Sequence, residues 1–141
     1  MKKILVFISF FLLLSGCSNE KTLVCTTTVQ EDQKTDIKVV AKWKNDNLEN
    51  FQLETIYYLE NTLTLKQQET FKNYIDESMS SWKNKEGIKY HSSLEKNQLN
   101  LTLEVDASKE MKALEAFSIN EKNSTYEEFK KSLEKQNYVC K

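Results

Sequence analysis

The sequence contains no proline, no arginine and a single histidine, His91. Its lysines are mixed with acidic residues along the chain, so it lacks the clustered basic surface that nucleic-acid binding requires. His91 and two cysteines could not complete a tetrahedral metal shell. No set of acid, base and nucleophile stands out either. We therefore expect no nucleic-acid partner, no metal, no cofactor and no enzymatic activity.

Glycine is almost as scarce, with Gly16 and Gly87 as the two examples. Turns must therefore come from asparagine, aspartate and lysine, as in the stretches "KNDN" and "KNQ". The chain has no linker-like, repetitive or low-complexity stretch. We expect one domain, which spans residues 23–141.

Long hydrophobic runs are missing except at the N-terminus. Lys2 and Lys3 precede an apolar run, Ile4 to Leu14, that is interrupted by Ser9. This run is shorter than the roughly 20 residues that a membrane-spanning helix needs. A positive segment followed by a short apolar run is typical of a secretory signal peptide.

The stretch Leu14-Ser15-Gly16-Cys17 follows this run directly and resembles the lipobox of bacterial lipoproteins. The resemblance implies a signal peptide over residues 1–16, cleavage before Cys17 and a lipid on the Cys17 sulfur. Two or three acyl chains make such an anchor stable. We expect a protein anchored to the cell membrane, facing its extracytoplasmic side, with residues 17–22 as a lipidated tether. An ordinary secretory signal is the alternative.

The chain has three cysteines, and disulfides in exported proteins use cysteines in pairs, so one cysteine is left without a partner. If Cys17 carries the lipid, Cys25 and Cys140 remain as a pair. A disulfide between them would join the first strand to the last residues of the chain. Two free thiols are the alternative reading.

Side chains alternate between apolar and polar in five segments, which is typical of strands with one buried face. The segments begin or end close to turn residues and span residues 23–29, 37–43, 51–59, 88–94 and 99–105. The first three predict a meander of antiparallel strands.

The period changes to that of a helix after Thr64. Phe71, Ile75, Met79 and Trp82 form one apolar stripe, which predicts a helix over residues 65–84 with Thr64 or Thr62 as its cap. A short helix or turn is expected in "DASKEMKALEAF", and a last helix follows Ser124 or Thr125. The order β-β-β-α-β-β-α predicts an α+β fold, with helices on one face of a five-stranded antiparallel sheet.

The lipobox, this order of elements and the stretches "KEGIKY", "VDASK" and "LEKQNYVCK" are similar to the YehR-like family of small bacterial lipoproteins. The resemblance implies the fold but no activity, because the family has no known function.

The sheet face away from the helices offers a possible binding surface. Val40, Ile56 and Tyr58 are apolar side chains among polar ones on that face, and such patches often mark contacts. The residues near Met111 could instead fold over this patch.

We expect a monomer that acts as a non-enzymatic binding or interaction module with an unknown partner in the cell envelope. A carrier for a small ligand or lipid is the alternative, and it would need a cavity between sheet and helices. The number of large aromatic side chains predicts a filled core instead.

Overall fold

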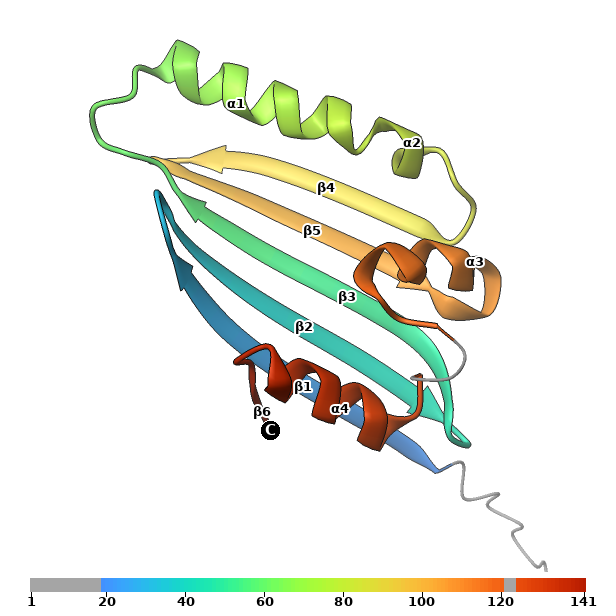
Figure 1. The fold of residues 1–141 in the computed structure, drawn as a ribbon. Coiled ribbons are helices and arrows are strands. Elements are labelled where there is room, and N and C mark those ends of the chain that lie inside the picture. Colours follow the sequence, from blue (N-terminus) through green and yellow to red (C-terminus); the bar gives the residue numbers. More distant parts are fainter. Residues whose placement is uncertain (1–18, 121–123) are drawn as a thin grey trace, which may run out of the picture.

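The five alternating segments form one antiparallel sheet together with a sixth, very short strand (Figure 1). This is seen in a computed structural model of the protein, which describes residues 19–120 and 124–141. The predicted α+β class is confirmed, and the strands lie in the order β4-β5-β3-β2-β1-β6. Their bounds are β1 (Glu20–Gln30), β2 (Lys34–Lys44), β3 (Asn47–Tyr58), β4 (Ile88–Glu95), β5 (Gln98–Asp106) and β6 (Val139–Cys140).

Strand β1 begins three residues earlier than predicted. Glu20 lies opposite Lys44 and Thr22 opposite Lys42, so these residues belong to the sheet and not to a tether. Their side chains do not alternate in polarity, and their place is set by main-chain pairing with β2.

Two hairpins turn through two residues, neither of them glycine. Asn45 and Asp46 join β2 to β3, and both have positive φ angles, 50° and 63°. Lys96 and Asn97 join β4 to β5 with φ angles of 41° and 63°. Positive φ at both central residues is the requirement of a two-residue type I′ turn, which asparagine and aspartate tolerate better than most residues.

All helices lie on one face of the sheet (Figure 1). Their bounds are α1 (Leu65–Ser78), α2 (Ser80–Lys83), α3 (Ala107–Leu114), the short 3-10 helix η1 (Glu115–Phe117) and α4 (Tyr126–Lys135). Thr64 caps α1 in a capping box with Gln67, as expected.

The predicted helix 65–84 is divided at Met79, whose backbone leaves the helical region. The Ser78 hydroxyl donates to the Ile75 carbonyl at 2.6 Å. In such a bond the serine hydroxyl competes with backbone N–H groups for a carbonyl acceptor of the helix. Ser80 and Ser81 follow Met79 and are also weak helix formers. The helix therefore ends one turn early and restarts as α2.

An acidic side chain of α1 ties this helix to β4. The Asp76 carboxylate accepts hydrogen bonds from Lys72 at 2.6 Å, Ser92 at 2.7 Å and Tyr90 at 2.9 Å. Lys83 of α2 lies 3.8 Å away. Burial opposes ionisation of this carboxylate, but the bonds from Lys72, Ser92 and Tyr90 outweigh it and lower the pKa of Asp76 to about 2.

The core lies between the sheet and the helices α3 and α4. Trp43 of β2 is 1% exposed, and its indole N–H donates to the Ser124 carbonyl at 2.6 Å. Its ring contacts Tyr126 and Phe129 edge-on, at centroid distances of 5.2 and 5.5 Å. Aromatic contacts of this geometry stabilise beyond the area they bury. Trp43 therefore fixes the first half of α4 over β1 and β2.

Strand β6 brings the C-terminus back to β1. Cys140 lies opposite Cys25 in the register of the two strands, and their sulfur atoms form a disulfide. Sequence patterns did not predict β6 as a strand, because two residues are too few to show an alternation. Cys25 itself is fully buried.

We expect Asp76→Asn to lower the free energy of unfolding at pH 7 by about 2 kcal/mol, the equivalent of the pKa shift. The folded-state pKa of Asp76 is depressed, so its contribution is present above about pH 4 and is lost as the pH falls toward 2. Chemical denaturation at pH 7, 4 and 2.5 measures this. The difference between the two proteins should shrink at the lowest pH.

Glu86→Gln is the matched control, because Glu86 is paired with Lys109 at 2.9 Å but is 84% exposed. Exposed ion pairs contribute little to stability. A loss in Glu86→Gln equal to that in Asp76→Asn would contradict the assigned role of the Asp76 cluster.

The disulfide should be measurable by intact mass. Without reductant, alkylation is expected to add no mass at Cys25 or Cys140; with reductant, it should modify both. Because 115 residues separate the two cysteines, reduction should lower the free energy of unfolding by about 4 to 5 kcal/mol in the chain-entropy model. Two reactive thiols in the untreated mature protein would contradict the bond.

Candidate functional site

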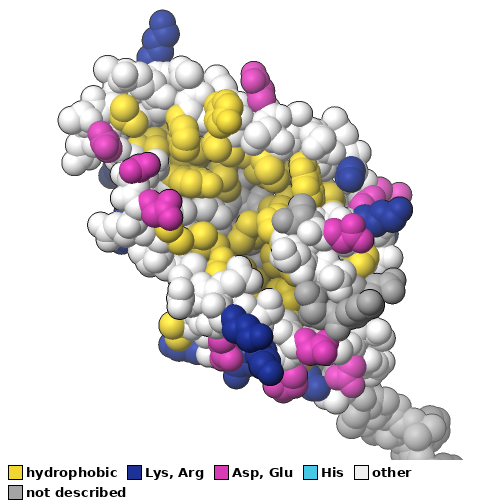
Figure 2. All heavy atoms as spheres, viewed as in Figure 1, with side chains coloured by type: hydrophobic (Ala, Val, Ile, Leu, Met, Phe, Trp, Pro, Cys, Tyr) yellow, Lys and Arg dark blue, Asp and Glu magenta, His cyan; other side chains and the backbone are white. Residues whose placement is uncertain are grey.

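The helices leave part of the sheet face uncovered. Helix α4 has ten residues and is about 15 Å long, whereas β3 has twelve residues and is about 40 Å long. Helices α1 and α2 lie over β4, and α4 lies over β1 and β6 (Figure 1). Hydrophobic side chains gather on the face between them (Figure 2). This face carries a groove of about 390 Å³.

The floor of the groove comes from β2 and β3. Val39 lies opposite Leu53 and Ile37 opposite Thr55, so alternate residues of both strands point to the same side. The floor residues are Ile37, Val39, Phe51, Leu53, Thr55 and Tyr57. Val39 and Phe51 are nearly inaccessible at its base, while Leu53 and Tyr57 are half-buried.

The walls come from the segment after α3 and from α4 with the residues that follow it. They are formed by Phe117, Ser118, Ile119, Phe129, Ser132, Leu133, Gln136 and Tyr138. The ring of Phe117 lies 5.3 Å from that of Phe51 and 5.9 Å from that of Trp82. Helix η1 therefore closes the end of the groove nearest the β2–β3 hairpin.

The opposite end of the groove lies toward Ile37 and Tyr57, near the turns that join β1 to β2 and β4 to β5. Tyr57 also meets Phe71 of α1 edge-on at 5.8 Å, which extends the apolar surface toward that helix. Burial raises the pKa of Tyr57 and of Tyr138. Both phenols therefore stay protonated at neutral pH and can donate hydrogen bonds.

The chemistry that the groove offers is apolar contact with a few neutral polar groups. Thr55, Ser118, Ser132 and Gln136 supply hydroxyl and amide groups, and no carboxylate, ammonium or imidazole is among the lining residues. Within residues 19–120 and 124–141, no group of three histidine, cysteine, aspartate or glutamate residues is placed to hold a metal ion. Such a lining is suited to holding a ligand.

The predicted surface of Val40, Ile56 and Tyr58 lies on the sheet face opposite the helices, and all three side chains are half-buried. The structure does not bring them into one apolar patch. Lys38 and Glu54 form an ion pair at 3.0 Å, and their row of this face lies between the row of Val40 and the row of Ile56.

Tyr58 takes part in a local polar network on that face. Its hydroxyl donates to the Asp36 carboxylate at 2.7 Å, and the Lys34 ammonium lies 4.4 Å from its ring centre. Met111 packs against the core on the helical side, so it does not cover these residues. Binding at this face stays a prediction.

The groove departs from the filled core that the sequence predicts. The stripe of Phe71, Ile75, Met79 and Trp82 does point toward the sheet, but each of these side chains remains half-buried. One signal could have revealed the opening: the predicted last helix is much shorter than the strands it would have to cover.

Comparisons with known proteins bear on the anchor and on the fold. The model for the prokaryotic membrane lipoprotein lipid attachment site matches residues 1–18, so the chain carries such a site; Cys17 lies outside the residues that the structure describes. No described helix is long and apolar enough to cross a membrane. A comparison with curated protein sequences finds no match.

Among solved structures, the chain is similar to the NMR structure of the Escherichia coli protein YehR. The TM-score is 0.61 at 10% sequence identity, and the similarity covers 86% of this chain and 92% of YehR. At this identity the similarity concerns the fold. The chain is thus a membrane lipoprotein whose domain has the fold of YehR.

Proposed function

We propose that this protein is a lipid-anchored, non-enzymatic binding protein of the cell envelope, and that it holds a small apolar ligand in the groove between α4 and the sheet. The observation that carries the proposal is the groove itself, with its apolar floor and neutral polar groups. Small-molecule sites have this character: mostly apolar, with a few polar groups that fix orientation.

The size of the groove favours a slender ligand. Its volume of about 390 Å³ is at the lower end of the range for small-molecule sites. A peptide helix about 10 Å in diameter would fill this volume with roughly one turn, at a pitch of 5.4 Å. An extended chain, such as the acyl chain of a lipid, fits the shape better, and each methylene it buries would contribute about 0.8 kcal/mol.

The polar groups in the walls would contact the head of such a ligand. Ser132 and Gln136 follow one another at the spacing of one helical turn, on the side of α4 that meets the groove. Gln136 is exposed, so it stands at the rim, and its amide donates to the Ser132 carbonyl at 3.3 Å. A neutral head group can be hydrogen-bonded there, whereas the lining offers no charge to balance a charged one.

A photoreactive long-chain alcohol, whose head group is neutral, tests the proposal with the mature lipidated protein in vesicles. After illumination and digestion, adducts should map to residues that line the groove. Ser132→Trp places a large side chain in the wall, because Ser132 is half-buried and lies on a helix. We expect it to reduce adduct formation at least fivefold while the thermal midpoint of unfolding changes little.

Val40→Gln is the control, because Val40 is also half-buried but lies on the opposite sheet face. It should leave labelling of the groove unchanged. Adducts spread over both faces, or labelling that Ser132→Trp does not reduce, would rule out the groove as the ligand site.

The anchor itself is tested by metabolic labelling with a radioactive fatty acid. The wild-type chain should incorporate label and sediment with membranes, because its N-terminus carries a lipoprotein attachment site. Cys17→Ala removes the thiol that would accept the lipid and should abolish incorporation. Equal incorporation by the two proteins would exclude Cys17 as the site of lipidation.

A further inference from the structure

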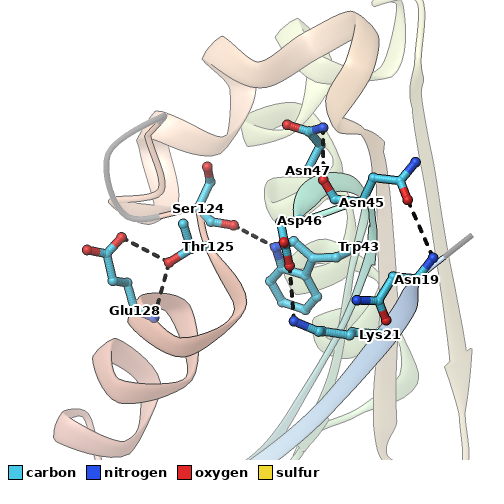
Figure 3. Close-up of polar contacts among 9 residues, drawn as sticks. All are labelled: Asn19, Lys21, Trp43, Asn45, Asp46, Asn47, Ser124, Thr125 and Glu128. Atoms are coloured by element: carbon cyan, nitrogen blue, oxygen red, sulfur yellow. Dashed lines mark hydrogen bonds and ion pairs between the residues drawn. The ribbon is translucent and has the colours of Figure 1, made fainter.

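The first described residue is bound to the tip of the β2–β3 hairpin (Figure 3). The Asn19 N–H donates to the side-chain oxygen of Asn45 at 3.4 Å, and the Asn45 N–H donates to the Asn19 carbonyl at 3.1 Å. The Lys21 ammonium lies 3.0 Å from the Asp46 carboxylate. The chain is therefore held to this hairpin as soon as it enters the structure.

The covalent chain leaves little distance between this point and the lipid. One residue, Ser18, separates Cys17 from Asn19 in the sequence. Consecutive Cα atoms are 3.8 Å apart, so the Cα atoms of Cys17 and Asn19 lie within about 7.6 Å of each other. The headgroup layer on each side of a bilayer is about 5 to 8 Å thick, from the difference between total and hydrocarbon thickness. The span between these two Cα atoms is therefore about as long as the layer is thick.

We propose that one end of the domain rests on the lipid headgroups of the membrane. This membrane-facing end consists of Asn19, Lys21, the hairpin residues 45–47 and the first turn of α4. The first turn of α4 lies here because the Trp43 indole holds Ser124 at 2.6 Å and the Lys21 ammonium lies 5.8 Å from the Tyr126 ring.

The length of the strands places the other end far from the bilayer. Strand β1 runs from this end for eleven residues, which is about 35 Å in extended conformation. Because the strands are antiparallel, the turn at residues 31–33 and the hairpin at 96–97 lie together at the distal end. The groove extends toward that end, at Ile37 and Tyr57, and is closed by η1 on the membrane side. A ligand therefore enters the groove from the aqueous space and not directly from the bilayer.

The charges at the membrane-facing end do not select one kind of lipid. Lys21 and Asp46 neutralise each other, Lys44 is exposed, and Glu127 and Glu128 stand in the first turn of α4. With both signs present, this end exerts no single-sign field on anionic headgroups. The orientation depends on the short covalent link, so it should be the same on neutral and anionic vesicles and at low and high salt.

Fluorescent labels at the two ends test the orientation in the lipidated protein on vesicles that contain a headgroup-attached quencher. Lys44→Cys labels the membrane-facing end and Asp32→Cys the distal end; both positions are exposed. The disulfide occupies Cys25 and Cys140, so the introduced thiol is available for labelling. We expect at least fivefold stronger quenching at position 44 than at position 32. The pair Glu49→Cys and Glu60→Cys, also exposed, repeats the comparison in case one variant fails to fold.

A spacer shows whether the short link causes this difference. Six glycine and serine residues inserted between Ser18 and Asn19 add up to about 20 Å of reach. We expect the ratio of quenching between the two ends to fall close to one. As a control, the same six residues inserted after Asp32 leave the link between Cys17 and Asn19 intact. The ratio of quenching at position 44 to quenching at position 60 should then stay unchanged.

Equal quenching at the two ends of the unmodified link, or stronger quenching at position 32, would overturn the proposal. The measurement involves no groove ligand, so the inference rests on the lipid anchor of the proposed function and not on its ligand. If the quenching difference is observed but photolabelling of the groove is not, the proposed orientation stands and the proposed ligand site is excluded.

Discussion

The structure depends on a mismatch in length between the strands and the helix that covers them. Each strand of the β1–β2–β3 meander has eleven or twelve residues, while α4 has ten, and a residue advances the chain more than twice as far in a strand as in a helix. Helix α4 therefore covers less than half the length of the strands beneath it. The apolar floor that it leaves open is the groove, and the half-buried state of Leu53 and Tyr57 follows from the same mismatch.

Two sets of contacts hold the helices at the edges of this opening. Trp43 holds α4 through its bond to the Ser124 carbonyl and its contacts with Tyr126 and Phe129. Asp76 holds α1 against β4 through two hydrogen bonds, from Tyr90 and Ser92. One set is aromatic and the other ionic, so acid weakens the α1 side first. Trp43 thus fixes the α4 wall of the groove, while Asp76 fixes the helix that lies beside the opening.

The strands and most turns could be predicted from the sequence because their signals are local. Alternating polarity located β1 to β5 to within a few residues, and the asparagine-containing stretches became the two-residue hairpins β2–β3 and β4–β5. Thr64 and Thr125 were each one of two candidate caps, because a cap is defined by its own side chain and a backbone N–H three residues later. The break at Met79 was not predicted, since the apolar stripe runs through it without interruption.

The anchor and the cysteine pair could also be predicted from the sequence. A lipid attachment site is a short linear segment, and once Cys17 is assigned to the lipid, Cys25 and Cys140 are the two cysteines left to form a disulfide. Binding at the surface of Val40, Ile56 and Tyr58 stays a prediction. The pattern placed Val40 and Ile56 on the same face, but the register of β2 and β3 puts the ion pair of Lys38 and Glu54 between them.

The lipid attachment site, the α+β class and the face on which each strand residue lies can thus be read from the sequence, because they depend on neighbours along the chain. The open core, the closure of one end of it by Phe117 and the bonds between Asn19 and Asn45 emerge from contacts between distant segments. Those features depend on how far a helix reaches over a sheet and on which distant segments meet. The predicted length of α4 indicates the first, but no local pattern shows which distant segments meet.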